Sequence, residues 1–276
     1  MWDSWDDDAF LRDKESGVWF DRDKMHFLNH QGKHFQVRGL LNVSRTPQGW
    51  PVIAQAGSSE PGRELAARTA DVVFTAQTEL VAAQEFYADI KGRTALYGRT
   101  PDDIKIMPGL TPVIGRTIEE AQAKYDELQA LLPDDLALAA LARFTRGIDI
   151  SSYDLDGPMP DLPEANSAKS RQQLIMAMAR KHNMTLRQVA RSVSAAQGHR
   201  VLVGTAEYIA DEMGEWLRKD AADGFCVICN HYPAPFQAFI NQVIPELQRR
   251  GIFRTEYEGR TLRENLGLKM PTSRYA

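Results

Sequence analysis

The chain has 276 residues, of which 43% are hydrophobic and 25% charged, and its formal net charge is −4. This is the composition of a globular protein that is long enough to bury a sizeable core. The acidic balance argues against nucleic-acid binding. No apolar run approaches the roughly 20 residues of a membrane span, and residues 1–10 lack the basic flank and apolar core of a signal peptide. We therefore expect a cytoplasmic protein that binds neither nucleic acid nor a membrane.

Four runs rich in Val and Ile predict buried parallel strands. They cover residues 51–56, 71–76, 104–115 and 224–229. A helical pattern follows each run, at residues 63–69, 80–91, 117–132 and 236–250. The third of these helices opens with the pattern of a capping box, formed by Thr117 and Glu120. Strands that alternate with helices indicate βαβ units and an α/β fold with a parallel sheet.

The connection between the third and fourth strands, approximately residues 132–203, is too long for a simple crossover. Helical patterns cover residues 134–146, 171–182 and 185–196, with an irregular, proline-containing segment among them, and a last pattern covers residues 206–220. Such an excursion in a regular α/β chain is typical of an insertion that carries function or covers a site. We predict that this insertion is helical and that the sheet has four core strands.

The first strand ends in a turn, Ala56–Ser59, that leads directly into a helix. The first N–H groups of a helix lack partners within the helix, and the helix dipole favours negative charge there. Gly57 permits close approach of the backbone, and Ser58 and Ser59 add hydroxyl donors. The turn therefore predicts an anion site. The alternative is that Ser58 or Ser59 only caps the helix, and Glu60 also weighs against an anion.

Three other motifs have less specific meanings. Thr205 is predicted to cap the helix that it precedes. Residues 184–213 resemble a helix-turn-helix with basic residues nearby, which makes a DNA-binding module an alternative function, although a solvated helix face also explains the charges. His26, His30 and His34 lie four residues apart, but the surrounding sequence predicts loop and strand, so we expect no metal site.

Polar and thiol side chains lie at the end of the fourth strand. Cys226 and Cys229 would point to opposite faces of a strand, which is a poor geometry for a disulfide. No further pair of Cys or His with ligand spacing accompanies them, so we expect neither a zinc site nor a redox motif. His231 and Tyr232 follow the strand directly. Since the carboxyl ends of barrel strands face the active site, both are candidates for a substrate pocket.

Six stretches, in this order along the chain, carry a resemblance to a known family. They are "LNVSRTPQGWPVIAQAGSSEPGRELAARTADVVFTAQ", "IKIMPGLTPVIGRTIEEAQAKYDELQ", "DISSYDLDGPMPDLPEANSAKSR", "HNMTLRQVAR", "VGTAEYIADEM" and "VIPELQRRGIFRTEYEGRTLRENLGL". The chain resembles the nitrilotriacetate and dibenzothiophene-sulfone monooxygenases, which are luciferase-like, two-component flavin enzymes. This resemblance implies a TIM-type barrel with an insertion, and reduced FMN (FMNH2) as the cofactor. It also implies a separate NAD(P)H-dependent flavin reductase as partner and oxygenation of a small organic substrate.

The resemblance also assigns roles to segments of this chain. It implies that Ala56, Gly57, Ser58 and Ser59 bind the FMN phosphate and that the insertion forms a lid over the substrate. The resemblance covers only the C-terminal half of the family's sequences. Residues 1–276 are therefore expected to form a single, incomplete luciferase-like domain. The catalytic residues would then lie in the absent half. Four strands cannot close a barrel, so the isolated chain is expected to be a homo-oligomer without monooxygenase activity.

Two alternatives to the monooxygenase stay open. One is a flavin or deazaflavin oxidoreductase of the wider luciferase-like superfamily. The other is a non-catalytic half-barrel subunit that needs a complementary chain. The sequence contains no G-x-G-x-x-G fingerprint that would mark an NADH site in this chain, which favours a separate reductase.

Overall fold

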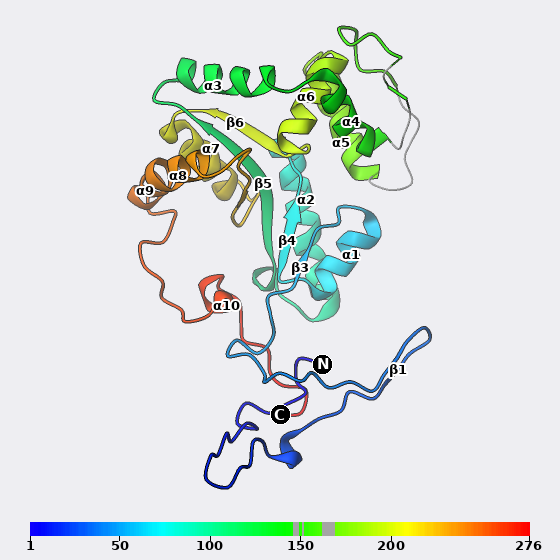
Figure 1. Cartoon of the computed structure of the whole chain (residues 1–276), viewed down its shortest axis with the longest axis vertical. Coiled ribbons are helices and arrows are strands. Elements are labelled where there is room, and N and C mark those ends of the chain that lie inside the picture. The colour runs from blue at the N-terminus through cyan, green and yellow to red at the C-terminus, as the bar shows by residue number, and fades with distance from the viewer. Residues whose placement is uncertain (146–148, 151, 162–168) are drawn as a thin grey trace. The chain divides into compact units, whose positions relative to one another are not determined.

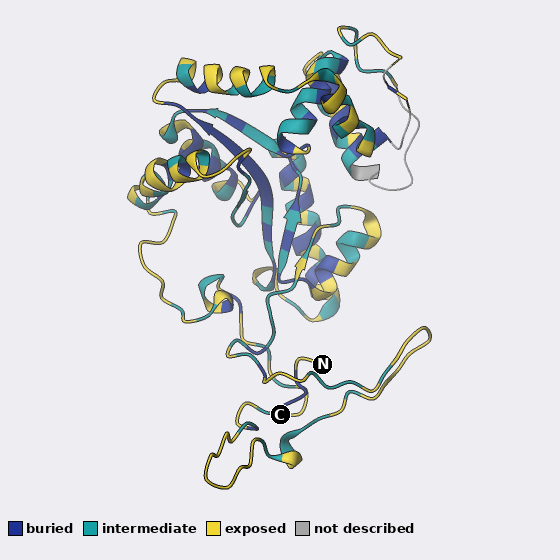
Figure 2. Ribbon diagram, in the orientation of Figure 1, coloured by how far each residue is buried: buried dark blue, intermediate teal, exposed yellow. Residues whose placement is uncertain are grey.

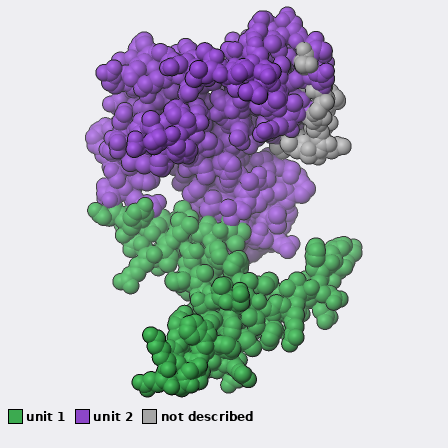
Figure 3. Space-filling view, viewed as in Figure 1, with its two compact units in different colours: residues 1–53, 256–276 green, residues 54–255 purple. Residues whose placement is uncertain are grey.

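The computed structural model describes residues 1–145, 149–150, 152–161 and 169–276. The contacts within the chain define two units, shown in Figure 3: unit 1 comprises residues 1–53 and 256–276, and unit 2 comprises residues 54–255. No helix among the described residues is both long and apolar enough to span a bilayer.

Unit 2 is built on a parallel sheet (Figure 1). Its strands among the described residues are β3 (Ala54–Gln55), β4 (Val72–Thr75), β5 (Lys105–Ile114), β6 (Arg200–Gly204) and β7 (Cys226–Val227). Strands β3, β4, β5 and β6 are hydrogen-bonded in that order, and β7 also pairs with β5. The predicted α/β class with parallel strands is confirmed.

The predicted number of four core strands was wrong, because β6 adds a fifth strand at the end of the region in which only helices and an irregular segment were expected. The reason lies in β5. Strand β4 pairs with β5 only as far as Pro108, whereas β5 continues to Ile114. The backbone groups at residues 110–114 need another partner when they are buried, and β6 supplies it through five paired positions.

Helices surround this sheet. Those of unit 2 are α1 (Glu60–Thr69), α2 (Leu80–Arg93), α3 (Ile118–Ala130), α4 (Asp134–Thr145), α5 (Lys169–Lys181), α6 (Leu186–Ala196), α7 (Ala206–Arg218), α8 (Ala234–Ala238) and α9 (Ile244–Arg249). A π-helical segment, Phe239–Val243, joins α8 to α9, so the helix predicted at residues 236–250 is one run with a wider turn inside it. The predicted capping box of α3 is only half formed. Thr117 caps Glu120, but the Glu120 carboxylate accepts the N–H of Arg116 instead.

The two faces of the sheet differ in what covers them. On one face, Val73 and Ile106 are buried with Phe86 and Ile90 of α2. Figure 2 shows the buried residues running along β5 and the helix sides next to it. Side chains alternate along a strand, so the residues between these point to the opposite face. We call this the inner face and define it by Phe74 of β4 and by Met107, Gly109 and Thr111 of β5.

The helices of the insertion share a core of their own. Buried apolar side chains of α4, α5 and α6 form one cluster, which includes Leu141, Ile175 and Val189. Helix α6 begins with a complete capping box between Thr185 and Gln188. The insertion is therefore helical over most of its described length, as predicted. Residue 146, where the first helix of the insertion was predicted to end, lies outside the described residues. So do residues 162–168, which belong to the stretch "DISSYDLDGPMPDLPEANSAKSR" of the family resemblance.

Unit 1 contains little regular structure. It has a 3-10 turn (Arg22–Lys24), a two-stranded antiparallel sheet of β1 (His30–Gln31) and β2 (Gln36–Val37), and the short helix α10 (Leu262–Asn265). His30 lies on β1, and His26 stacks on Tyr275 at 4.2 Å between ring centroids. The prediction of loop and strand for the histidine-containing segment is therefore confirmed.

The buried cation Arg45 helps to hold the two sequence segments of unit 1 together. Its Nε donates to Asp3 Oδ1 at 3.0 Å, its Nη1 to Asp7 Oδ1 at 3.0 Å, and its Nη2 to the carbonyl of Pro271 at 2.6 Å. Trp50 Nε1 donates to the same Asp3 oxygen at 2.7 Å. This network joins residues that lie more than 200 positions apart in the sequence.

Candidate functional site

The Ala56–Ser59 turn lies between β3 and α1, where the sequence predicted it. Ser59 is the N-cap of α1, and its Oγ accepts the N–H of Gly62 at 3.3 Å. The Ser58 hydroxyl lies 3.4 Å from Thr75 Oγ1, at the end of the neighbouring strand β4. Gln77 Nε2 donates to the same Thr75 oxygen at 3.3 Å. The carboxyl ends of two adjacent strands thus bring three polar side chains together.

Sequence reasoning did not single out Thr75 and Gln77. Both are buried, and both follow from the topology, because parallel neighbours end at the same edge of a sheet. The signal in the sequence was Thr75 directly after the run "DVVF", with Gln77 two residues further on.

Two glycines make the turn compact. A Cβ atom on Gly57 would lie 2.5 Å from Gln55 Nε2, and one on Gly62 would lie 3.0 Å from the Gly57 carbonyl carbon. Only glycine permits this close approach of backbone segments. Next to the turn, Gln55 Oε1 is buried without a hydrogen-bond partner among the described residues. The turn therefore offers a close-fitting backbone, and beside it lies a buried acceptor that a donor group of a ligand could satisfy.

The charged side chains next to the turn are paired with one another. The carboxylate of Glu60, which weighed against one, is paired with Arg93 at 2.5 Å, and this hydrogen bond lowers the pKa of Glu60. Arg63 Nε donates to the carbonyl of Ser58 at 2.9 Å, and its Nη1 is paired with Asp89 at 2.8 Å. Arg93 therefore compensates the charge of Glu60, and Asp89 compensates that of Arg63, whose guanidinium lies directly beside the turn.

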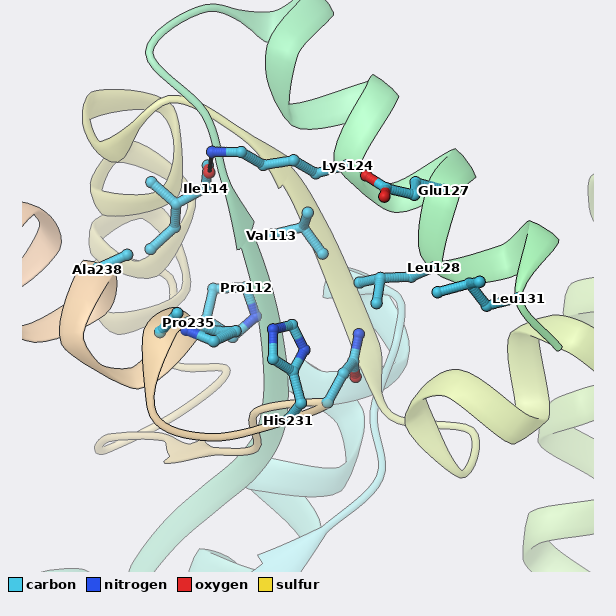
Figure 4. Close-up of a pocket in the computed structure, with 12 residues that line it drawn as sticks. Pro112, Val113, Ile114, Lys124, Glu127, Leu128, Leu131, His231, Pro235 and Ala238 are labelled. Atoms are coloured by element: carbon cyan, nitrogen blue, oxygen red, sulfur yellow. Dashed lines mark hydrogen bonds between the residues drawn. The ribbon is translucent and has the colours of Figure 1, made fainter.

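A cavity of about 440 Å³ lies between the end of β5, α3 and α8 (Figure 4). Most of its wall is apolar, from Pro112, Val113, Ile114, Leu128, Leu131, Ala234, Pro235 and Ala238. Its polar lining consists of Lys124, Glu127, Asn230 and His231. Lys124 is held by the Ile114 carbonyl at 3.0 Å and by Glu120 at 2.9 Å. The cavity can therefore accommodate a small molecule with an apolar body and a polar end.

Of the two residues that the sequence predicted for a substrate pocket, only His231 lines this cavity. His231 lines the cavity, and Figure 4 shows its ring beside Pro112 and Pro235. Tyr232 does not line it: its side chain is 65% exposed, and its ring lies 5.8 Å from that of Phe236. The lining of this cavity does not include the Ala56–Ser59 turn among the described residues. The structure thus separates His231 from the predicted phosphate ligands.

The cysteines have no redox partner in the described structure. Cys226 lies on β7, opposite Gly109 of β5, and Cys229 is buried. Burial raises the pKa of both thiols, which makes them poor nucleophiles. Among the described residues, no group of three or more His, Cys, Asp or Glu is placed to hold a metal ion.

Comparisons with known proteins give a consistent result. The luciferase-like monooxygenase family matches residues 17–224. The chain is 53% identical to N-acetyl-S-(2-succino)cysteine monooxygenase of Bacillus subtilis (strain 168), over 100% of this chain and 63% of that protein. It is 51% identical to nitrilotriacetate monooxygenase component A of Aminobacter aminovorans, over 100% of this chain and 61% of that protein.

Among solved structures, riboflavin lyase (RcaE), crystallised with modified FMN and riboflavin, is similar with a TM-score of 0.79 and 35% identity. The similarity covers 98% of this chain and 59% of that one. The chain therefore spans less than two thirds of the length of each of these three proteins.

Proposed function

Because the chain belongs to the luciferase-like monooxygenases, we propose that it is part of an FMNH2-dependent monooxygenase that oxygenates a small organic molecule with O2. The observation that carries this proposal is the Ala56–Ser59 turn, whose backbone and hydroxyls suit a phosphate dianion. A related structure crystallised with modified FMN supports the choice of flavin. When bound, reduced FMN supplies the reactivity toward O2.

The residues of the turn have distinct roles in this proposal. The backbone N–H groups of the turn and the first turn of α1 bind the phosphate, and Ala56 and Gly57 allow the backbone to approach it. The Ser58 hydroxyl, which faces Thr75, donates to a phosphate oxygen. Ser59 caps α1 and so fixes the direction of those N–H groups. Arg63, which is paired with Asp89, fixes the carbonyl of Ser58 through a hydrogen bond.

The substrate side of the proposal rests on the rest of unit 2. His231, at the cavity of β5 and α3, forms part of the substrate wall. The insertion, approximately residues 132–203, covers the bound molecule. Exclusion of water is the task of such a cover.

The partners follow from the same family membership. Since one relative is named component A of its enzyme, we propose that a separate NAD(P)H-dependent reductase supplies the reduced flavin. Residues 1–276 form part of one luciferase-like domain in this proposal, and the protein works as a cytoplasmic homo-oligomer.

The phosphate site is tested by replacing its hydroxyls. Ser58→Ala with Ser59→Ala should weaken FMN binding by about 1–3 kcal/mol, the scale of hydrogen bonds to a charged group. Isothermal titration of FMN into the purified chain measures this. Ser58→Ala alone keeps the N-cap of α1 and isolates the contact with the ligand. Thr117→Ala, which removes the N-cap of α3, is the matched control and should leave the FMN affinity unchanged. Unchanged affinity in the double variant would contradict the proposal.

A further inference from the structure

His199, in the connection between α6 and β6, lies against the inner face of the sheet. A Cβ atom on Gly109 of β5 would be only 2.3 Å from His199 Nδ1, so the ring occupies the space that a side chain at residue 109 would fill. The ring centroid lies 4.8 Å from that of Phe74 on β4. His199 is 7% exposed. An imidazole is thus seated on the inner surface of β4 and β5.

Two buried polar atoms at this place have no hydrogen-bond partner among the described residues. One is His199 Nδ1, and the other is Oγ1 of Thr111, which is fully buried and lies two residues beyond Gly109 on the same face. A buried polar group without a partner is costly, and native structures contain few of them. Because Nδ1 has no acceptor, the ring proton is favoured on Nε2, where it is available to donate.

A cation without a carboxylate lies next to His199. Arg171, near the start of α5, donates from Nη1 to the carbonyl of Gln197 at 2.6 Å. A Cβ on Gly198 would lie 3.3 Å from the same nitrogen. No carboxylate among the described residues pairs with Arg171. In contrast, carboxylates compensate the buried or half-buried cations Arg45, Arg63, Arg93 and Lys91.

The surroundings agree with an uncompensated positive charge. Burial lowers the pKa of Arg171, and burial together with the charge of Arg171 lowers the pKa of His199 to about 4. At neutral pH the imidazole is therefore uncharged, and the guanidinium carries the charge. A half-buried guanidinium is more favourable when an anion shares its low-dielectric environment.

We propose that Arg171 and His199 together bind a carboxylate group of the substrate at the inner face of the sheet. The planar guanidinium suits the two oxygens of a carboxylate, and the imidazole N–H adds a second donor beside it. This inference rests on the proposed function and deepens it, because it makes the oxygenated molecule a small carboxylic acid. Phosphate shares much of this chemistry, so the FMN phosphate is the competing source of the anion.

The test uses the full chain without flavin and three probes: succinate, its neutral analogue succinamide, and inorganic phosphate. Isothermal titration should show binding of succinate and none of succinamide. Arg171→Gln should weaken succinate binding at least about tenfold, as expected for the loss of a charged hydrogen bond. Arg171→Lys should restore part of it, and His199→Gln should weaken it. Arg180→Gln, an exposed position of the same helix, is the matched control and should have no effect.

The outcomes of these titrations distinguish a failure of the carboxylate site from a failure of the proposed FMN site. Equal succinate affinity in the wild type and in Arg171→Gln would overturn the carboxylate site, and so would phosphate binding that depends on Arg171 and excludes succinate. FMN titrated into Arg171→Gln should bind as in the wild type, since its phosphate is assigned to the Ala56–Ser59 turn. Loss of FMN binding in Ser58→Ala with retained succinate binding would support the two sites as separate. Circular dichroism checks that each variant is folded.

Discussion

Buried and half-buried cations in this chain differ in how many acceptors of the protein surround them. Arg45 satisfies its guanidinium with two carboxylates and a carbonyl. Lys91 does so with Asp223 at 2.9 Å and with the carbonyls of Pro101 and Ile104. These networks hold distant segments together and use donors from each nitrogen of the cation. Arg171 differs because, among the described residues, a single carbonyl accepts from it. At the scale of the residue, the number of protein acceptors distinguishes these structural cations from a candidate for binding.

Removal of the Arg45 side chain should destabilise unit 1. Arg45→Ala leaves Asp3 buried without its cation, and breaking a buried pair of this kind costs about 3–5 kcal/mol. Urea unfolding followed by tryptophan fluorescence measures the loss, since Trp50 donates to Asp3 in the same network. Arg22→Ala, at an exposed position of unit 1, should change the midpoint little. Equal midpoints for the two variants would show that the network contributes no stability.

His199 should make stability depend on pH in a defined window. Its pKa is lowered from 6.5 to about 4 by burial and by Arg171, so the unfolded chain binds the proton more readily. The contribution of neutral His199 is present above pH 6.5 and is lost as the pH falls to 4. At about 1.4 kcal/mol per pKa unit, the loss amounts to at most about 3.5 kcal/mol.

The matched comparison for this prediction is His199→Gln, which cannot titrate. Carboxylates titrate in both proteins over the same range, so the difference between the two urea-unfolding series isolates the histidine. The gap between their free energies of unfolding should shift in favour of His199→Gln as the pH is lowered. A gap that stays constant from pH 7 to pH 4 would mean that His199 is not buried in its neutral form.

At the scale of the element, local signals predicted helices better than strands. The starts of α1, α3 and α6 follow from their N-caps, Ser59, Thr117 and Thr185, which act within one turn. In contrast, β3 and β7 have only two residues each, because a partner strand decides how far a strand extends. Strand β6 could not be found from its own five residues, since it exists by pairing with the end of β5.

In the candidate site, too, the sequence predicted the contacts that are local and missed those between distant segments. The Ala56–Ser59 turn is contiguous in sequence, and its conformation is set by nearby residues, so the sequence predicted it. The contact between Ser58 and Thr75 joins two strands, and the contact between Phe74 and His199 joins residues more than 100 positions apart. No local pattern encodes such pairs. The inner-face histidine therefore became visible only from the structure.

Replacement of glycine by alanine is expected to have opposite effects on stability at two positions. A Cβ on Gly115 would lie 2.4 Å from the backbone nitrogen of Ala121, where β5 meets the first turn of α3. Gly115→Ala should therefore destabilise the protein by about 1–3 kcal/mol through overpacking. A Cβ on Gly92 in α2 would meet nothing within 4 Å, so Gly92→Ala should stabilise the helix by about 0.5–1 kcal/mol. Thermal unfolding of both variants measures the two signs, and a stabilising Gly115→Ala would refute the close approach.

At the scale of the whole molecule, the described sheet is open. Its described strands end at β3 on one side, and a parallel sheet is normally covered on both faces. On the inner face, Phe74, Met107 and Val201 are only half-buried. Unpaired edges and half-covered apolar faces are the surfaces through which chains associate.

The isolated chain should therefore self-associate through the inner face. Light scattering after size exclusion should give a mass above the 31.0 kDa of one chain at micromolar concentration. Val201 pairs with Thr111 and so shares the inner face. Val201→Asp places a charge there, which opposes its burial between chains, and should shift the mass toward that of the monomer. Val81→Asp changes a valine of α2 that is 65% exposed and should leave the mass unchanged. A wild-type chain that stays monomeric at every concentration tested, with a single cooperative unfolding transition, would mean that the open edge and the inner face need no partner.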